Sequence, residues 1–314
     1  MAGTRRMLHV GIPDWDRCQH VSKGLLDGLR AHGIRCTYRP PRLKLAADVL
    51  SVVEEFRRTE GLSFEDDFVV AVNPGSKFKH KRWPVDRYVE ICRWLISRYQ
   101  ARIVVVSQNR SDFAARTLYN RLPRRNRTWL ANQSLDSVAA ILSHCSICIG
   151  NDSGIAHLAS VVGVPTVTVF GPTSPRLWKP AGGKAIMLQS RHACEECGYE
   201  GAERCRDKKC LTDITTEEFA DGIIYCISRH LRRESHPRLD RISVARHLDI
   251  VSTKAGTVLR NREIQRPLLV RVGLPQVLGV LKLVEGSHSY SQVIRRAPQH
   301  RQLLDMLARH RIVV

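Results

Sequence analysis

The chain alternates between two patterns of hydrophobic and polar positions. Four apolar runs of strand length lie within residues 67–76, 101–108, 146–154 and 165–173. Between them, apolar residues recur every three or four positions, which is typical of helices with one buried face. Strands that alternate with helices in this way predict a parallel, doubly wound sheet with helices on both faces. We therefore expect an α/β fold.

The segments on either side of this region have a different pattern. Residues 20–32 and 46–59 have helical spacing, with Gly33 placed to end the first helix, and residues 34–39 have the composition of a strand. After a further predicted helix and a charged, proline-containing linker, residues 242–314 combine strand-like and helical pieces. This tail resembles a small winged-helix unit or a peptide-binding domain, and a helical stabilising tail is the alternative.

Three polar loops follow the predicted strands and are expected at one edge of the sheet, where the carboxyl ends of parallel strands meet. The first combines a hydroxyl, backbone N–H groups and lysines, which suits a phosphate. The second precedes a helix, whose first N–H groups favour a negative group. The third offers a glycine and a threonine to a diphosphate. The candidate binding residues are Asn73, Gly75, Ser76, Lys77, Lys81, Asp152, Ser153, Gly154, His157, Gly171 and Thr173.

Each loop also has a simpler interpretation. The lysines are expected in any solvated basic loop, and Asp152 in any capped helix. His157 fits a core position, and Trp178, after the third loop, fits either core packing or stacking on a base. The position of all three loops at strand ends favours a binding site over these alternatives.

The charge of the chain is regional. Among 314 residues, 50 Lys and Arg against 30 Asp and Glu give a net charge of +20. Residues 77–130 hold 14 basic and 3 acidic residues, and residues 236–314 hold 14 and 5. Such regions are typical of proteins that bind phosphate-bearing ligands, nucleic acids, membrane surfaces or acidic peptides. A hydrophobic content of 43% excludes a disordered chain. No apolar run approaches the roughly 18 residues of a membrane span, and no signal peptide is evident, so we expect a cytoplasmic protein.

Four of the ten cysteines form a cluster, Cys194, Cys197, Cys205 and Cys210. In a reducing compartment this spacing indicates a metal site before it indicates disulfides. Four thiolates suit tetrahedral zinc or a single iron, and they leave no open coordination position. We therefore expect a structural metal, with scattered thiols or a disulfide pair as the alternatives.

Two segments, NPGSKFKHKRWPVDRYVEICRWL and GNDSGIAHLASVVGVPTVTVFGPTSPRLWKP, resemble glycosyltransferase family 9, the ADP-heptose–lipopolysaccharide heptosyltransferase family. The resemblance implies a GT-B-type fold, with two Rossmann-like domains that face a cleft. It implies that Ser76 and Lys81 hold the diphosphate, and that the donor sugar and phosphate are held by Asp152, Ser153, Gly154 and His157. The cysteine cluster resembles the iron finger of heptosyltransferases that modify autotransporter proteins.

The chain departs from the family on the acceptor side. Only 72 residues precede Asn73, where the family has a complete acceptor domain, and the family's catalytic Gly-Asp loop is missing. Asp14 and Asp16 are the candidates for the general base that activates an acceptor hydroxyl. The donor domain also departs from the family at Ser107 and Gln108, after the second strand, where the family often has a glycine or an acidic residue that contacts the nucleoside. We divide the chain into a shortened acceptor domain at 1–66, one complete Rossmann-like donor domain at 67–234, with the finger at 194–210, and the tail at 242–314.

Together these features predict a glycosyltransferase that moves a sugar, with heptose as the first choice, from a nucleotide-diphosphate donor such as ADP-heptose. The acceptor is a hydroxyl of the lipopolysaccharide core or of a protein or peptide, and the first of these fits work at the inner membrane surface. No catalytic divalent metal is required, because lysines and a helix dipole balance the phosphate charge. The alternatives are a non-catalytic donor-binding portion that needs a partner chain for the acceptor side, and a basic nucleic-acid-binding protein.

Overall fold

The computed structural model describes most of the chain between residues 20 and 309. The described residues are 20–46, 49–190, 198–231, 248–253, 256–261, 268–270, 280–281, 293, 295 and 297–309. Asp14, Asp16, Cys194 and Cys197 lie outside them, as does the linker. None of the described helices combines the length and the apolar character that a membrane crossing needs.

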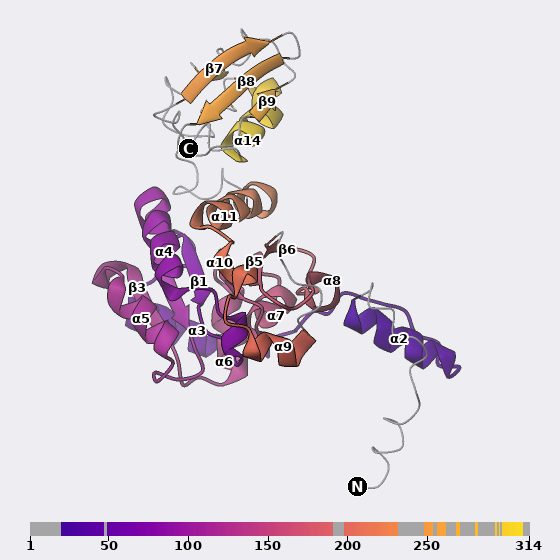
Figure 1. The fold of residues 1–314 in the computed structure, drawn as a ribbon. Helices are drawn as coiled ribbons and strands as arrows, with labels where there is room; N and C mark the ends of the chain where they lie inside the picture. The colour runs from indigo at the N-terminus through magenta and orange to yellow at the C-terminus, as the bar shows by residue number, and fades with distance from the viewer. Residues whose placement is uncertain are drawn as a thin grey trace, which may run out of the picture.

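A six-stranded parallel sheet forms the centre of the protein (Figure 1). Its order is β3-β2-β1-β4-β5-β6, and every neighbouring pair is parallel. The strands are β1 (Val69–Asn73), β2 (Arg102–Val106), β3 (Arg127–Leu130), β4 (Ile147–Asn151), β5 (Thr166–Phe170) and β6 (Ala185–Gln189). The predicted α/β fold is therefore confirmed, and the order is that of a doubly wound dinucleotide-binding sheet.

Helices cover both faces of the sheet because the central strands are apolar on both sides. Successive residues of β1 alternate between two buried clusters, Val70 and Val72 in one and Val69 and Ala71 in the other. The first cluster also contains α4 (Val85–Tyr99), α5 (Phe113–Arg121) and α11 (Thr216–His230). The second contains α3 (Leu50–Glu60), α6 (Leu135–Ser143) and α7 (Gly154–Val161).

Side-chain caps fix the starts of two helices. Asp112 is the N-cap of α5, and its Oδ1 accepts from Ala115 N at 2.8 Å. Ser111 Oγ donates to Asn109 Oδ1 at 2.6 Å. At α11, Thr215 and Glu218 form a reciprocal capping box.

The sheet has two edge strands that the apolar pattern did not reveal. β3 has four residues and lies between arginines and polar residues, and β6 is only partly buried, so neither gives the fully buried apolar run of a central strand. Conversely, residues 34–39, predicted as a strand, are irregular. The segment passes near the start of the edge strand β6, since Tyr38 and Ala185 line one groove, but it forms no ladder with any described strand.

Several short elements complete this region. They are two 3-10 turns, η2 (Lys79–Lys81) and η3 (Arg124–Asn126), and the helices α8 (Pro175–Trp178), α9 (Gly198–Arg204) and α10 (Lys209–Thr212). The first described helix, α2 (Val21–Ala31), ends before Gly33, whose φ of 78° is left-handed, as the sequence predicted. Figure 1 shows α2 at the side of the molecule where α8 lies.

The described part of the tail contains an antiparallel sheet of β7 (Leu248–Thr253), β8 (Gly256–Asn261) and β9 (Leu268–Val270). A 3-10 turn, η5 (Pro298–His300), precedes α14 (Arg301–Arg309), which contacts α11 (Figure 1). Leu304 and Leu307 of α14 are fully buried. The tail is therefore attached to the main sheet through α11.

Candidate functional site

The site lies where the strand order reverses, between β1 and β4. Asn73 ends β1 and pairs with Gly150 of β4. The backbones approach so closely that a Cβ on Gly150 would lie 2.6 Å from the Asn73 carbonyl oxygen. In open parallel sheets, ligands bind at the carboxyl ends of the strands at this reversal. The first and second predicted loops begin here.

A buried amide joins these two loops. Asn151 is fully buried, and its Oδ1 accepts from Trp83 N and from the Tyr88 hydroxyl, both at 2.9 Å. Its Nδ2 donates to the carbonyl oxygens of Pro74 at 2.8 Å and Gly75 at 3.2 Å. Four hydrogen bonds to a group without access to water fix the first loop relative to β4.

The carboxylate of Asp152, in the second loop, accepts hydrogen bonds from the first and third loops. Asp152 Oδ2 accepts from Lys81 Nζ at 2.7 Å and from Thr173 Oγ1 at 2.7 Å. The side chains of Lys81 and Asp152 are 15% and 5% exposed. An ammonium group is thus held near the edge of the site by a buried partner, with part of its surface open to a ligand.

The start of α7 is available to a ligand. Ser153 occupies the N-cap position, but its Oγ donates to Asn73 Oδ1 at 2.9 Å and makes no capping bond to the helix. Gly154 is exposed, and a Cβ there would have no atom within 4 Å. Helix N–H groups that the cap leaves unsatisfied attract an anion. This end of α7 therefore offers N–H groups to open space.

The loop from Gly75 to Arg82 is held against its neighbours. A Cβ on Gly75 would lie 2.8 Å from Asp112 Oδ2, so the backbone passes directly over the α5 cap. Arg82 Nε donates to the Ser76 carbonyl oxygen at 2.8 Å. Lys81 Nζ also lies 5.9 Å from the centre of the Phe78 ring. These contacts place Ser76 and Lys81 on the same loop surface.

The segment that carries Cys205 and Cys210 packs beneath this loop. Trp83 Nε1 donates to Ile214 O at 3.0 Å, and Arg87 donates to the same oxygen at 2.5 Å. Leu211 lies 3.0 Å from the position that a Cβ on Gly171 would take. A structural change in the segment that carries Cys205 and Cys210 would therefore shift the first and third loops.

The comparisons with known proteins concern this same region. The sequence model of glycosyltransferase family 9 (heptosyltransferase) matches residues 42–208, which is more than half of the chain. The chain belongs to glycosyltransferase family 9. The matched residues include all three loops and the strands from which they extend.

Relatives of glycosyltransferase family 9 match the chain over part of their length. It is 26% identical to lipooligosaccharide heptosyltransferase 2 of Haemophilus influenzae over 162 residues, covering 48% of this chain and 44% of the relative. It is 30% identical to lipopolysaccharide heptosyltransferase 2 of Escherichia coli over 122 residues, covering 37% and 34%. The chain thus aligns with less than half the length of these two relatives.

A solved structure supports the fold. The family 9 glycosyl transferase of Veillonella parvula has a TM-score of 0.59 and 21% identity, and the match covers 67% of this chain and 60% of that one. At this identity the similarity concerns the fold alone.

Most of the residues that the sequence selected for a family 9 donor site meet at one edge of the sheet. Contacts join Asn73 to Ser153, and Asp152 to Lys81 and Thr173. The same loops and the start of α7 also carry Gly75, Ser76, Gly154 and His157. Gly171, in the third loop, packs against Leu211 and the His80 carbonyl oxygen. Two residues are exposed: Lys77, whose Nζ lies 5.5 Å from the centre of the Phe78 ring, and Gln108, which follows β2.

Two outcomes differ from simple interpretations of the sequence. Trp178 is 46% exposed, so core packing does not account for it. Asn151 escaped notice although it connects two loops. The available signal was an amide at the end of a fully apolar strand, where only a residue with buried hydrogen-bond partners is stable.

Burial lowers the pKa of His157 below its usual 6.5; the Asp152 carboxylate opposes this shift, and His20 and Lys81 add to it. The unfolded chain therefore takes up this proton at a higher pH than the folded chain. We expect a contribution to stability that is complete above about pH 6.5 and is lost as the pH falls through the lower folded-state pKa. Thermal melts between pH 5 and 8 measure it.

The substitution His157→Gln should make the melting temperature fall less steeply below pH 6.5. Burial also lowers the pKa of His80 and His230, so part of the acid sensitivity stays in the variant. His32→Gln, at an exposed position after α2, is the matched control. A variant with the same acid profile as the parent protein contradicts the prediction.

Proposed function

We propose that the chain transfers a sugar from a nucleotide-diphosphate donor to a hydroxyl acceptor. The observation that carries the proposal is the meeting of Lys81, Asp152 and Thr173 beside the start of α7. Ammonium, hydroxyl and helix N–H groups converge there, at the sheet reversal where such ligands bind. The nucleic-acid-binding alternative has no comparable site among the described residues.

In this proposal, the protein acts mainly on the leaving group. As the bond from the sugar to the diphosphate breaks, negative charge builds up on the departing phosphate oxygens. Lys81, Ser76 and the first N–H groups of α7 would stabilise that charge without having to reorganise. Asp152 and His157 would hold the sugar and its phosphate, which fixes the distance and orientation of the reacting atoms. The arrangement does not require a catalytic divalent metal.

The acceptor side needs a base for the attacking hydroxyl. Asp14 or Asp16 would accept the proton as the oxygen forms its bond to the sugar. Both residues lie outside the described part of the chain, so their role rests on the sequence. The alternative is that a separate chain supplies the acceptor side. The match covers only 44% of the length of the Haemophilus influenzae relative and 34% of that of the Escherichia coli relative.

We propose ADP-heptose as the donor and a lipopolysaccharide core or a protein hydroxyl as the acceptor. Curated relatives are called lipopolysaccharide heptosyltransferases, and a solved structure with a TM-score of 0.50 is called an ADP-heptose lipopolysaccharide heptosyltransferase. Gln108, exposed after β2, lies at the edge where the nucleoside would bind. Work in the cytoplasm, at the inner membrane surface, fits the lipopolysaccharide acceptor.

The experiment is a transfer assay. The purified chain is incubated with ADP-heptose, GDP-heptose or a UDP-sugar and with each acceptor class, and mass spectrometry detects the acceptor with one added sugar. Calorimetry measures donor binding alone. Donor binding without transfer supports the alternative of a donor-binding portion, whereas the absence of binding to every nucleotide sugar defeats the proposal.

The three-part division, with boundaries at 1–66, 67–234 and 242–314, also stays a proposal. Deleting residues 242–314 should spare donor binding. If the tail is a peptide-binding-like unit, the deletion should abolish capture of a protein acceptor only. If it is a stabilising tail, the deletion should lower the melting temperature, because buried leucines of α14 pack near α11.

We propose that Cys194, Cys197, Cys205 and Cys210 bind one structural zinc or iron ion. Cys205 Sγ accepts an N–H bond from Lys208 at 3.4 Å, the kind of contact that stabilises a thiolate ligand. In contrast, burial raises the pKa of Cys148 and Cys226 to about 12, so these thiols stay protonated. Among the described residues no group of three or more ligands forms, because half of the cluster lies outside them.

Metal analysis tests this proposal directly. The purified chain should contain about one zinc or iron per molecule, and the double variant Cys205→Ser, Cys210→Ser should contain none. The variant should also melt at a lower temperature, since the metal binds only the folded chain. Cys36→Ser, at a comparably half-buried cysteine, is the control and should keep the metal. A double variant that retains the metal would falsify the assignment.

A further inference from the structure

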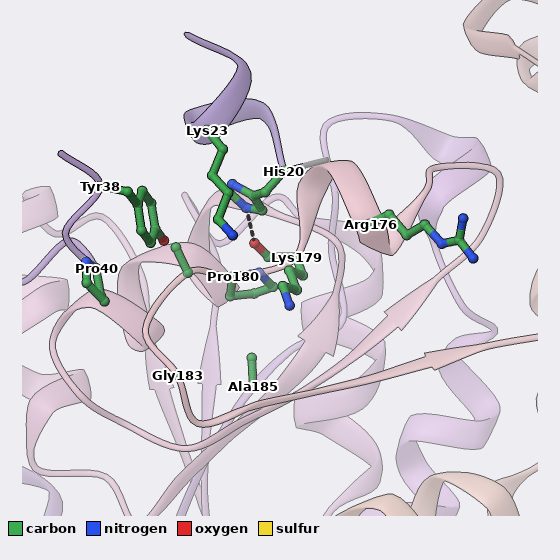
Figure 2. Close-up of a pocket in the computed structure, with 10 residues that line it drawn as sticks. His20, Lys23, Tyr38, Pro40, Arg176, Lys179, Pro180, Gly183 and Ala185 are labelled. Atoms are coloured by element: carbon green, nitrogen blue, oxygen red, sulfur yellow. Dashed lines mark hydrogen bonds between the residues drawn. The ribbon is translucent and has the colours of Figure 1, made fainter. Parts of the chain in front are cut away.

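A groove lies between the first described helix and the third loop (Figure 2). Its volume is about 590 Å³. One wall is formed by α2 and the segment after it, and the other by the chain from α8 to β6. Two parts of the chain that are far apart in sequence thus form one concave surface.

The wall from α2 is fixed by a histidine. Ser22 N donates to His20 Nδ1 at 3.3 Å, so that nitrogen carries no proton and the proton lies on Nε2. Nε2 then donates to the Lys179 carbonyl oxygen at 2.9 Å, which is the dashed line in Figure 2. On the opposite side, Gly182 N donates to Ser160 Oγ at 2.8 Å, which ties the floor of the groove to α7. The groove is therefore built by specific contacts on both walls.

The charged side chains that line the groove are all basic. Lys23, Lys179 and Arg176 contribute three cations, and none of the ten lining residues is an Asp or Glu. Figure 2 shows Lys23 descending from α2 toward Lys179, while Arg176 points away along α8. Lys23 Nζ also lies 5.7 Å from the Tyr38 ring, which positions it on the wall. Two ammonium groups without a nearby carboxylate favour an oxyanion.

The groove is next to the proposed donor site. Its floor is tied to α7, the helix whose first turn carries Gly154 and His157. Its histidine, His20, lies close enough to His157 for the two side chains to interact electrostatically. A ligand in the groove would therefore lie within reach of the donor sugar.

We propose that this groove binds the anionic group of the acceptor, a phosphate or carboxylate, between Lys23 and Lys179. The proposal rests on the proposed function only in naming the acceptor as the source of the anion. An acidic acceptor held at Lys23 and Lys179 would be positioned to present its hydroxyl to the donor sugar near the start of α7. The groove would thus select acidic acceptors over neutral ones.

The test uses the full chain saturated with ADP, so that the donor site is filled. Inorganic phosphate and, separately, acetate are titrated, and NMR follows the amides of Gly182 and Gly183. We expect saturable shifts and a loss of affinity of about tenfold in the double variant Lys23→Gln, Lys179→Gln. Lys44→Gln, an exposed lysine outside the groove, should bind like the parent protein. Affinity for ADP should be the same in all three.

Vesicles of phosphatidylglycerol, with phosphatidylcholine as the neutral control, form a second arm. Cosedimentation that the double variant loses would identify a lipid headgroup as the source of the anion; phosphate binding without cosedimentation would identify a soluble or sugar-borne anion. Both results support the groove. It is overturned if phosphate and acetate cause no saturable shift, if the double variant binds them equally well, or if phosphate displaces ADP. If ADP itself does not bind, the donor proposal fails, and the same titration without ADP still tests the groove.

Discussion

Replacing Lys81 with methionine should lower the rate of sugar transfer about 100-fold or more. Its Nζ is held 2.7 Å from Asp152 Oδ2, beside the start of α7, where the departing diphosphate would bind. Methionine keeps the length of the side chain but removes the cation that balances the developing charge. ADP should also bind about tenfold more weakly, since a charge-assisted contact is lost. The transfer assay and calorimetry with ADP measure the two effects.

The loss must be separated from damage to the fold. Lys81→Met leaves the buried Asp152 carboxylate with Thr173 as its remaining described partner, which costs stability. Adding Asp152→Asn removes that charge and should recover most of the melting temperature, while donor binding stays weak. Lys79→Met, an exposed lysine on the same turn, is the matched control and should change ADP affinity less than about threefold. Full activity in Lys81→Met would contradict the proposed role.

Gly150→Ala should destabilise the protein by about 3 kcal/mol. The added Cβ would lie 2.6 Å from the Asn73 carbonyl oxygen, and both residues belong to central, fully buried strands. Because backbone atoms and not a flexible side chain must shift, the two strands would have to separate. The melting temperature should fall by roughly 6–12 °C. Separation of β1 and β4 would also move Asn73 away from Ser153 and weaken ADP binding.

A second glycine in the same region provides the comparison. Gly154→Ala places a Cβ where no atom lies within 4 Å, at the first position of α7, so its melting temperature should not fall. Thermal unfolding followed by circular dichroism compares the two variants with the parent protein. If Gly150→Ala melts like Gly154→Ala, the close approach of β1 and β4 is not a constraint on this fold.

The sequence and the structure agree best where a local pattern has one solution. Fully apolar runs such as Val69–Val72, bounded by turn residues and alternating with helical segments, favour central strands, and the loops after such strands lie at one edge of a parallel sheet. The two edge strands carry a weaker signal, because β3 is only four residues long and begins with an arginine, and β6 is only partly buried. The segment 34–39 has the composition of a strand but pairs with no described strand, and composition alone does not decide whether a ladder forms.

By itself, the sequence determined the α/β class and the position of the three polar loops that we propose bind the donor. These follow from local periodicity and turn chemistry, which depend on residues close together in the chain. Only the tertiary structure decided which groups meet. Lys81 and Asp152 are 71 positions apart, Asn151 contacts Trp83 and Pro74 across two strands, and His20 reaches Lys179 over 159 positions. Such contacts depend on strand order and packing, and neither is written in any single segment of the chain.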